Sequence, residues 1–322
     1  MNRTVCQWEK RIVWGHGSTG VQSLGGMLEA TQFILPDGSQ VSPFQIAPWH
    51  NEEKSTELDG ILQRLRGEWP CVPFGPDEVE NDPHGYGSNN HWTIDETDQL
   101  SLALHIDYPE NHSIARLERT ITPDQGAPAL DFELKIIVRH DCQLPIGLHP
   151  VFKLPPQKGS FKIEVGDKDR VATFPGDLDA SSIFNKDQVA PISAIPLRAG
   201  GVCDARSLPL DQNTEDLLQL IDVDGHVSLV NLIEKHRITL SWNKNHFPST
   251  LFWISNKGRT AYPWLGRHLA LGVEPICSAF DLGASISVAE NSINKLGIPT
   301  IRNFKAGEIF VTSYRVEVTN LD

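Results

Sequence analysis

Apolar and polar residues alternate with a period of two through much of this chain. The clearest example is residues 131–136, where the order is Asp, Phe, Glu, Leu, Lys and Ile. Successive side chains of a β-strand point to opposite faces, so this alternation indicates strands with one buried face and one face in water. The pattern predicts strands at residues 100–108, 113–122, 130–140, 160–165, 238–242, 251–255 and 309–318.

Helical periodicity is scarce by comparison. Only two short segments, residues 58–65 and 177–184, have a spacing compatible with helices. Turn-forming residues separate the predicted strands, as at residues 124–126 (Asp-Gln-Gly) and 305–307 (Lys-Ala-Gly). Many short strands with frequent turns predict an all-β protein with a large antiparallel β-sandwich. No linker or repeat divides the chain, so we expect a single domain over residues 1–322.

The segment from residue 42 to residue 92 departs from this rhythm. It is rich in proline and glycine and shows little strand pattern. Loops of this length inside a compact domain are usually either functional or disordered. Trp49, Trp69 and Trp92 favour an ordered, functional loop, because disordered segments are poor in aromatic residues.

The composition is that of an ordinary globular protein. Of 322 residues, 39% are hydrophobic and 21% are charged, which provides ample material for a core. The formal net charge of -13 argues against non-specific binding to nucleic acid and against attraction to an anionic membrane, since both need a basic surface. We therefore expect a small-molecule ligand.

The cysteines and the N-terminal residues indicate a reducing compartment. The five cysteines form no C-x-x-C pair, and the first ten residues contain no apolar stretch typical of a signal peptide. We expect free thiols and a cytoplasmic protein. The cysteines are Cys6, Cys71, Cys142, Cys203 and Cys277.

Two tetrapeptides share a pattern of a glycine, an aliphatic residue, an ionisable residue and a proline. They are residues 147–150 (Gly-Leu-His-Pro) and 272–275 (Gly-Val-Glu-Pro). In a strand, the ionisable residue faces the same side as the glycine two positions earlier, where the absent side chain leaves room for a ligand or a backbone. Proline restricts the residue before it to an extended backbone, so His149 and Glu274 would be held firmly. They are a candidate acid and base, although a proline is also common where a strand ends in a turn.

Three other motifs do not indicate a function. Residues 15–20 match G-x-G-x-x-G, but no amphipathic helix or βαβ unit surrounds them, so a glycine-rich strand turn is the better interpretation. The histidines lack the spacing of a zinc site, and no nucleophile elbow is present. We expect neither a metal nor a cofactor.

Residues 83–87 (Pro-His-Gly-Tyr-Gly) place His84 beside an aromatic residue in the long loop. A sugar site needs aromatic faces against the apolar side of a pyranose and polar groups for its hydroxyls. Tyr86, Trp92 and Trp253 could provide such faces. Each could equally belong to the core, and His84 could be a surface residue.

Taken in order, these segments resemble the aldose 1-epimerase (galactose mutarotase) family along nearly the whole chain. Residues 84–86, followed by Trp92, are similar to the family's His-Gly-aromatic and Trp segment, and residues 147–152 to its Gly-x-His-Pro-x-Phe. Residues 273–275 resemble the apolar-Glu-Pro that carries the family's catalytic glutamate.

Two further segments extend the resemblance. Residues 305–308, ahead of Tyr314, look like the family's C-terminal Gly-Glu and Tyr strand. Residues 65–75 are similar to the Arg-Gly-Gly-x-Pro and Phe-Gly run of the branch that acts on hexose 6-phosphates.

The resemblance implies a galactose mutarotase-like sandwich with a sugar groove on one sheet. It implies that Glu274 is the general base that removes the anomeric hydroxyl proton, and that His149 is the general acid that protonates the ring oxygen. It also implies an aspartate that binds sugar hydroxyls, for which Asp216 is the best local match and Asp211 and Asp222 are close alternatives. Together with the aromatic candidates, the expected substrate-binding residues are His84, Arg66, Asp216, Trp253 and Tyr86.

One departure from the hexose-6-phosphate branch bears on the substrate. Where that branch has an arginine that helps to hold phosphate, this chain has Ser88. Arg66 alone would pair less well with a phosphate dianion than two arginines, so we expect an unphosphorylated sugar.

The expected function is therefore that of an aldose 1-epimerase-like isomerase acting on a hexose, as a monomer or a homodimer. A carbohydrate-binding protein without turnover and a hexose-6-phosphate 1-epimerase are the alternatives. A glycoside hydrolase or lyase would require a second carboxyl group, about 5 to 10 Å from Glu274.

Overall fold

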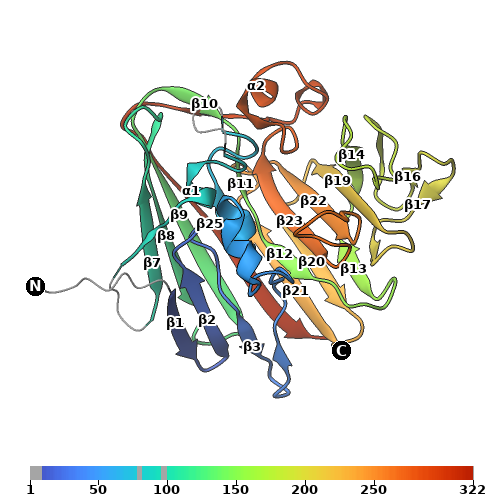
Figure 1. Ribbon diagram of the computed structural model, residues 1–322, viewed down its shortest axis with the longest axis horizontal. Helices are drawn as coiled ribbons and strands as arrows, with labels where there is room; N and C mark the ends of the chain where they lie inside the picture. The colour runs from blue at the N-terminus through green and yellow to red at the C-terminus, as the bar shows by residue number, and fades with distance from the viewer. Residues whose placement is uncertain (1–8, 78–81, 96–99, 322) are drawn as a thin grey trace, which may run out of the picture.

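The computed structural model describes residues 9–77, 82–95 and 100–321. Its strands form two large antiparallel sheets and several small ones. In Figure 1, three strands of one large sheet lie side by side on the left, namely β7 (Leu102–Asp107), β8 (Ile114–Pro123) and β9 (Ala129–Val138). Three strands of the other lie on the right, namely β19 (Thr214–Ile221), β22 (Ser249–Asn256) and β23 (Leu269–Cys277). The prediction of an all-β protein with antiparallel sheets is confirmed.

The first large sheet contains most of the strands that alternation predicts. Strand β9, for example, has buried residues at every second position along Phe132, Leu134 and Ile136, while Asp131 and Glu133 are exposed. Within the described residues its nine strands run in the order β18 (Ser207–Leu208), β13 (Phe161–Glu164), β20 (His226–Asn231), β21 (His236–Trp242), β25 (Ile309–Asn320), β9 (Ala129–Val138), β8 (Ile114–Pro123), β7 (Leu102–Asp107) and β6 (Thr93–Ile94).

The second large sheet is buried on both of its faces. Every residue of β19 and of β22 is buried, so these strands lack the alternation that a half-exposed strand shows. The order of strands is β15 (Val189–Pro191), β14 (Arg170–Thr173), β19 (Thr214–Ile221), β22 (Ser249–Asn256), β23 (Leu269–Cys277), β11 (Ile146–Leu148) and β5 (Pro70–Cys71), with β12 (Val151–Lys153) also paired to β23.

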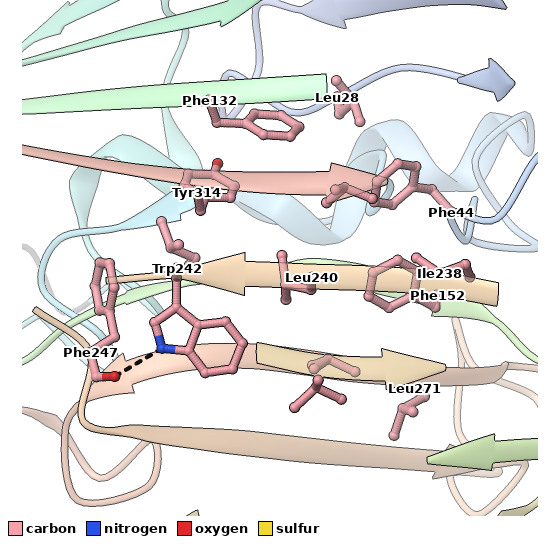
Figure 2. Packing of buried hydrophobic residues seen from close by; sticks show 14 of the residues in the cluster. Leu28, Phe44, Phe132, Phe152, Ile238, Leu240, Trp242, Phe247, Leu271 and Tyr314 are labelled. Atoms are coloured by element: carbon pink, nitrogen blue, oxygen red, sulfur yellow. Dashed lines mark hydrogen bonds between the residues drawn. The ribbon is translucent and has the colours of Figure 1, made fainter. Parts of the chain in front are cut away.

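Two hydrophobic cores explain this double burial. The main core lies between the large sheets, where Phe132 of β9 and Tyr314 of β25 stack with ring centroids 4.5 Å apart and Trp242 donates a hydrogen bond to the carbonyl of Phe247 (Figure 2). A second core covers the outer face of the second sheet. In β22, Phe252 belongs to the first core and Trp253 to the second.

The segment of residues 42–92 forms much of the second core. Trp49 and Trp69 are fully buried, which confirms that the described part of this segment is ordered. Its backbone bonds to the sheet below, since the amide of His149 donates to the carbonyl of Trp69 at 2.9 Å. The buried ion pair of Glu68 with Arg119 of β8 ties the segment to the first sheet.

Small elements complete the structure. Strands β1 (Glu9–Trp14) and β2 (Gly17–Gln22) form a hairpin, which confirms a strand turn at residues 15–20. The remaining elements are β3 (Gln32–Ile34), β4 (Gln40–Val41), η1 (Glu53–Glu57), η2 (Gly60–Gln63), α1 (Tyr86–Asn89), β10 (Cys142–Leu144), β16 (Ile195–Pro196), β17 (Val202–Cys203), α2 (Gly283–Val288), η3 (Asn294–Leu296) and β24 (Arg302–Phe304).

The helix predicted at residues 177–184 is wrong. Asp179 accepts hydrogen bonds from the backbone and hydroxyl of Ser181, at 2.8 and 2.6 Å, and such local bonds favour a turn over a helix. In place of the helix predicted at residues 58–65, the structure has only the short 3₁₀ helix η2. None of the helices in the described part of the chain has the length and hydropathy needed to cross a membrane.

Candidate active site

A cavity of about 250 Å³ lies on the outer face of the second sheet, under the segment of residues 42–92. It contains five ionisable side chains on an otherwise apolar lining. The ionisable residues are His84, His149, Arg259, Glu274 and Asp281, and the apolar ones are Ile61, Leu62, Leu65, Pro83, Leu178, Leu217, Leu251, Trp253 and Trp264.

Strand register explains why these side chains meet. Residues directly opposite each other in antiparallel strands point to the same face of the sheet. Leu251 of β22 is opposite Glu274 of β23, and Trp253 is opposite both Gly272 and Leu217. One face of three neighbouring strands therefore forms the floor of the cavity.

The two glycines of the repeated tetrapeptide make room for protein groups. A Cβ atom on Gly272 would lie 2.2 Å from Oε1 of Glu274, and one on Gly147 would lie 2.3 Å from the ring of Phe74. Such approaches are impossible without displacement. The glycine at 272 therefore allows the carboxyl group of Glu274 to fold back over the strand.

His149 lies between β11 and β12, in a fixed aromatic environment. Its ring stacks on Trp69 with centroids 4.1 Å apart, and the ring of His84 meets it edge-on at 4.9 Å. Pro150 follows His149, and the backbone amide of His149 donates a hydrogen bond to the carbonyl of Trp69. The imidazole is therefore held by packing on two sides.

The structure brings His149 and Glu274 together. Nδ1 of His149 is 3.5 Å from Oε1 of Glu274, and the two side chains are only 5% and 2% exposed. Neither atom has a hydrogen-bond partner among the described residues. Buried polar atoms are normally paired, so this unsatisfied pair is a natural place for the polar groups of a ligand.

Burial controls the protonation of this pair. It lowers the pKa of His149 well below its usual value, and the neighbouring His84 lowers it further. Burial also raises the pKa of Glu274 well above its usual value, with a smaller contribution from the negative charge of Asp281. Burial therefore favours the neutral form of the imidazole and the protonated form of the carboxyl group.

His84 lines the cavity, as the sequence-based hypothesis requires. Its backbone is left-handed with φ of 61°, which is uncommon outside glycine and typical of functional positions. Its Nδ1 accepts a hydrogen bond from the amide of Gly75 at 3.4 Å, and burial lowers its pKa to about 4. His84 is therefore neutral at pH 7.

Three of the residues expected to bind substrate do not line the cavity. Arg66 is buried against Glu29 in an ion pair of 2.5 Å, so its charge is already satisfied. The ring of Tyr86 packs against Tyr108 at 5.2 Å, next to the main core. The third residue is Asp216.

Side chains alternate along a strand, and that of Asp216 points to the face of β19 away from the cavity. Its carboxylate accepts hydrogen bonds from the amides of Ile183 and Phe184, at 3.1 and 3.4 Å, and therefore orders the segment beside the strand. The alternatives Asp211 and Asp222 also lie outside the cavity. They form ion pairs with Lys158 and Lys168 near the surface.

Glu215, one position earlier, has the orientation that we expected of Asp216. It is fully buried and accepts hydrogen bonds from the indole of Trp253 at 2.6 Å and from the hydroxyl of Ser255 at 3.1 Å. Its Oε1 also lies 3.4 Å from Nε of Arg259. Glu215 thus supports Trp253 and Arg259, which line the cavity. No sequence motif pointed to Arg259, but the strand period could have indicated Glu215.

A second carboxyl group, that of Asp281, also lines the cavity. The preceding turn is clamped by Gln219 of β19, which accepts from the amide of Phe280 at 2.8 Å and donates to the carbonyl of Ser278 at 2.9 Å. Phe280 has a left-handed backbone with φ of 50°. Burial raises the pKa of Asp281. The sequence gave no signal for this residue, because its position depends on the clamp.

No group of three or more His, Cys, Asp or Glu side chains in the described part of the chain has an arrangement that could hold a metal ion. The histidines and carboxyl groups that line the cavity are side chains that can transfer protons.

Comparison with known proteins identifies the fold. Neither a family model nor a curated protein matches the sequence. Among solved structures, an Escherichia coli K12 protein provisionally described as an aldose 1-epimerase matches with a TM-score of 0.68 and 14% identity, over 97% of this chain and 99% of its own.

Two other solved structures are similar over almost the full length. The aldose epimerase homologue from C. elegans matches with a TM-score of 0.66 and 10% identity, covering 98% of this chain and 99% of its own. The galactose mutarotase related enzyme from Lactobacillus acidophilus has a TM-score of 0.61 and 12% identity, with 98% of each chain covered. This protein therefore has the galactose mutarotase-like β-sandwich fold.

Proposed function

We propose that this protein is an aldose 1-epimerase-like isomerase that interconverts the α and β anomers of a hexose. The observation that carries the proposal is the buried, unsatisfied pair of His149 and Glu274, 3.5 Å apart on the floor of the cavity. Conversion of anomers needs one proton donor and one proton acceptor, and this pair holds one proton between two groups.

The reaction balances with these two groups alone. One of them takes the proton of the anomeric hydroxyl while the other gives a proton to the ring oxygen, and the bond between C1 and the ring oxygen breaks. The product is the open-chain aldehyde. Rotation about the C1–C2 bond and ring closure, with both proton transfers reversed, give the other anomer and restore the pair.

Two distributions of the proton are compatible with this scheme. The family resemblance implies that Glu274 starts as the base and His149 as the acid, which requires an ion pair. The burial of both groups favours a protonated Glu274 and a neutral His149. These states contain the same number of protons and are equivalent in a pH–rate profile. The ¹⁵N shifts of His149, with and without bound sugar, distinguish them.

The proposal is tested by saturation-transfer NMR of anomer exchange with glucose, galactose and their 6-phosphates. We expect acceleration over buffer by the native protein and its loss in Glu274→Gln and His149→Ala. If no sugar exchanges faster than in buffer, the isomerase proposal fails for these sugars. Calorimetric binding that is retained in Glu274→Gln, without exchange by the native protein, would indicate a carbohydrate-binding protein instead.

The second carboxyl group favours one other candidate function. Hydrolysis of a glycoside uses two carboxyl groups that flank the scissile bond, and Asp281 shares the cavity with Glu274. Release of nitrophenol from nitrophenyl glycosides by the native protein, but not by Asp281→Asn, would support this function. Anomer exchange that survives in Asp281→Asn, with no glycoside cleavage, would leave the isomerase proposal in place.

A further inference from the structure

Arg259 stands out because, among the described residues that line the cavity, it is the only permanent cation. Its guanidinium carbon lies 4.7 Å from the ring centroid of Trp264 and 5.9 Å from that of Trp253, so the group is supported by aromatic faces. Its Nε atom faces the buried Glu215 at 3.4 Å. These contacts fix the position of the guanidinium before a ligand arrives.

The remaining nitrogens of Arg259 are available to a ligand. Among the described residues, no protein acceptor forms a hydrogen bond with its two terminal nitrogens, and the side chain is 29% exposed. A guanidinium presents a planar fork of donors that matches a carboxylate.

Arg259 packs on strands of the cavity floor other than those that carry the proton-transfer pair. Arg259 contacts Glu215 of β19 and Trp253 of β22, whereas Glu274 is on β23 and His149 follows β11, one strand further. The floor beside Arg259 is apolar and includes Leu217. A sugar whose anomeric carbon contacts Glu274 would therefore direct its opposite end towards Arg259.

We propose that the substrate carries a carboxylate at the end opposite its anomeric carbon, as in a hexuronate, and that Arg259 is the residue that selects it. This inference rests on the proposed isomerase function for the orientation of the sugar. A monoanion fits better than a phosphate dianion, because the described lining of the cavity has only one permanent cation and Glu215 already balances part of its charge. The arginine expected to hold phosphate, Arg66, is occupied by Glu29 outside the cavity.

Other charges in the cavity are compatible with an anion. Glu274 and Asp281 face the same space as Arg259. Burial raises the pKa of both carboxyl groups, which reduces the negative charge that an incoming carboxylate meets. The apolar wall beside Arg259 strengthens a charge-assisted hydrogen bond, since the local dielectric is low.

The test compares glucuronate and galacturonate with glucose, galactose and glucose 6-phosphate, by calorimetry and by anomer exchange at one ionic strength. We expect the hexuronates to bind at least about tenfold more tightly than the neutral hexoses. Arg259→Met should abolish this preference and Arg259→Lys should retain part of it. Arg259→Met leaves the buried Glu215 without its cationic partner. The double variant Glu215→Gln/Arg259→Met removes both charges and therefore provides a second test of the preference.

Arg116→Met is the matched control, since Arg116 pairs with Asp107 on the exposed surface of the first sheet, and it should keep the preference. Equal binding of hexuronates and hexoses, or a preference that survives both Arg259 variants, would overturn the inference. Tighter binding of glucose 6-phosphate than of glucuronate would overturn the assignment of a carboxylate. Binding of hexuronate through Arg259 without any anomer exchange would sink the isomerase proposal and leave this inference standing.

Discussion

Glu215 and Asp216 are neighbours in β19, but their side chains lie on opposite faces of the second sheet. Glu215 lies beneath Trp253 and Arg259 at the cavity, and Asp216 binds the amides of Ile183 and Phe184 on the other side. Two adjacent positions of one strand therefore have different roles: Glu215 holds residues of the cavity in place, and Asp216 stabilises the fold.

Substitution of Asp216 should lower stability without affecting catalysis. In Asp216→Asn, one acceptor oxygen becomes an amide donor, so a buried backbone amide loses its partner at a cost of about 1–3 kcal/mol. Urea unfolding measures this loss. Anomer exchange per folded molecule should remain within about twofold of the native rate. A large fall in exchange at unchanged stability would contradict the placement of Asp216 outside the site.

Glu274→Gln should remove catalysis while leaving the fold intact. Glutamine has nearly the same shape but cannot exchange a proton, so the rate of anomer exchange should fall by about 10² to 10⁴-fold. Saturation-transfer NMR gives the rate, and thermal unfolding provides the control for folding. A variant with the native rate would exclude Glu274 from proton transfer.

Gly272→Ala tests whether the glycine positions the carboxyl group of Glu274. The new methyl group would lie 2.2 Å from Oε1 of Glu274, so the carboxyl must move. A displacement of about 1 Å at a reacting group can cost roughly 10²-fold in rate. Gly126→Ala is the control, because its nearest neighbour would be an oxygen of Asp124 at 3.5 Å in an exposed turn. Equal rates for the two variants would contradict this role.

The rate of anomer exchange should be level between the lowered pKa of His149 and the raised pKa of Glu274, and it should fall on both sides. At acid pH His149 is protonated as well as Glu274, so the pair has no proton acceptor. Because the pKa of His149 is lowered, this occurs below the usual titration range of histidine. On the alkaline side Glu274 loses its proton, and because its pKa is raised this occurs above the usual range of glutamate. A profile that falls already between pH 7 and pH 6 would contradict the lowered pKa of His149.

Acid should destabilise the protein through His84. Its pKa of about 4 in the folded state lies below the usual value of 6.5, so the unfolded state binds the proton first and stability falls as the pH drops from 6.5 towards 4. The loss attributable to His84 should reach roughly 3 kcal/mol at pH 4. Urea unfolding at pH 7 and pH 4.5 should show a smaller difference for His84→Asn. The exposed His226 offers the matched control, His226→Asn, which should keep the native difference.

Local patterns were sufficient for most of the first sheet and insufficient for the second. Strands β7, β8 and β9 have one exposed face, so alternation between apolar and polar residues marks them clearly. Strands β19 and β22 are buried on both faces, which removes that alternation. For the same reason the sequence could not show which carboxylate of β19 faces the cavity.

The sequence by itself determined the all-β class and the candidate pair of His149 and Glu274, since the period of two and the repeated Gly-aliphatic-ionisable-Pro pattern are properties of neighbouring residues. It also contained His84 and Trp253, which line the cavity. Only the tertiary structure decided the rest. Arg259, Asp281 and Glu215 reach the site through strand register, an aromatic stack and the clamp by Gln219. Each of these contacts joins residues far apart in the chain, and their energies appear only when the sheets and the covering segment pack together.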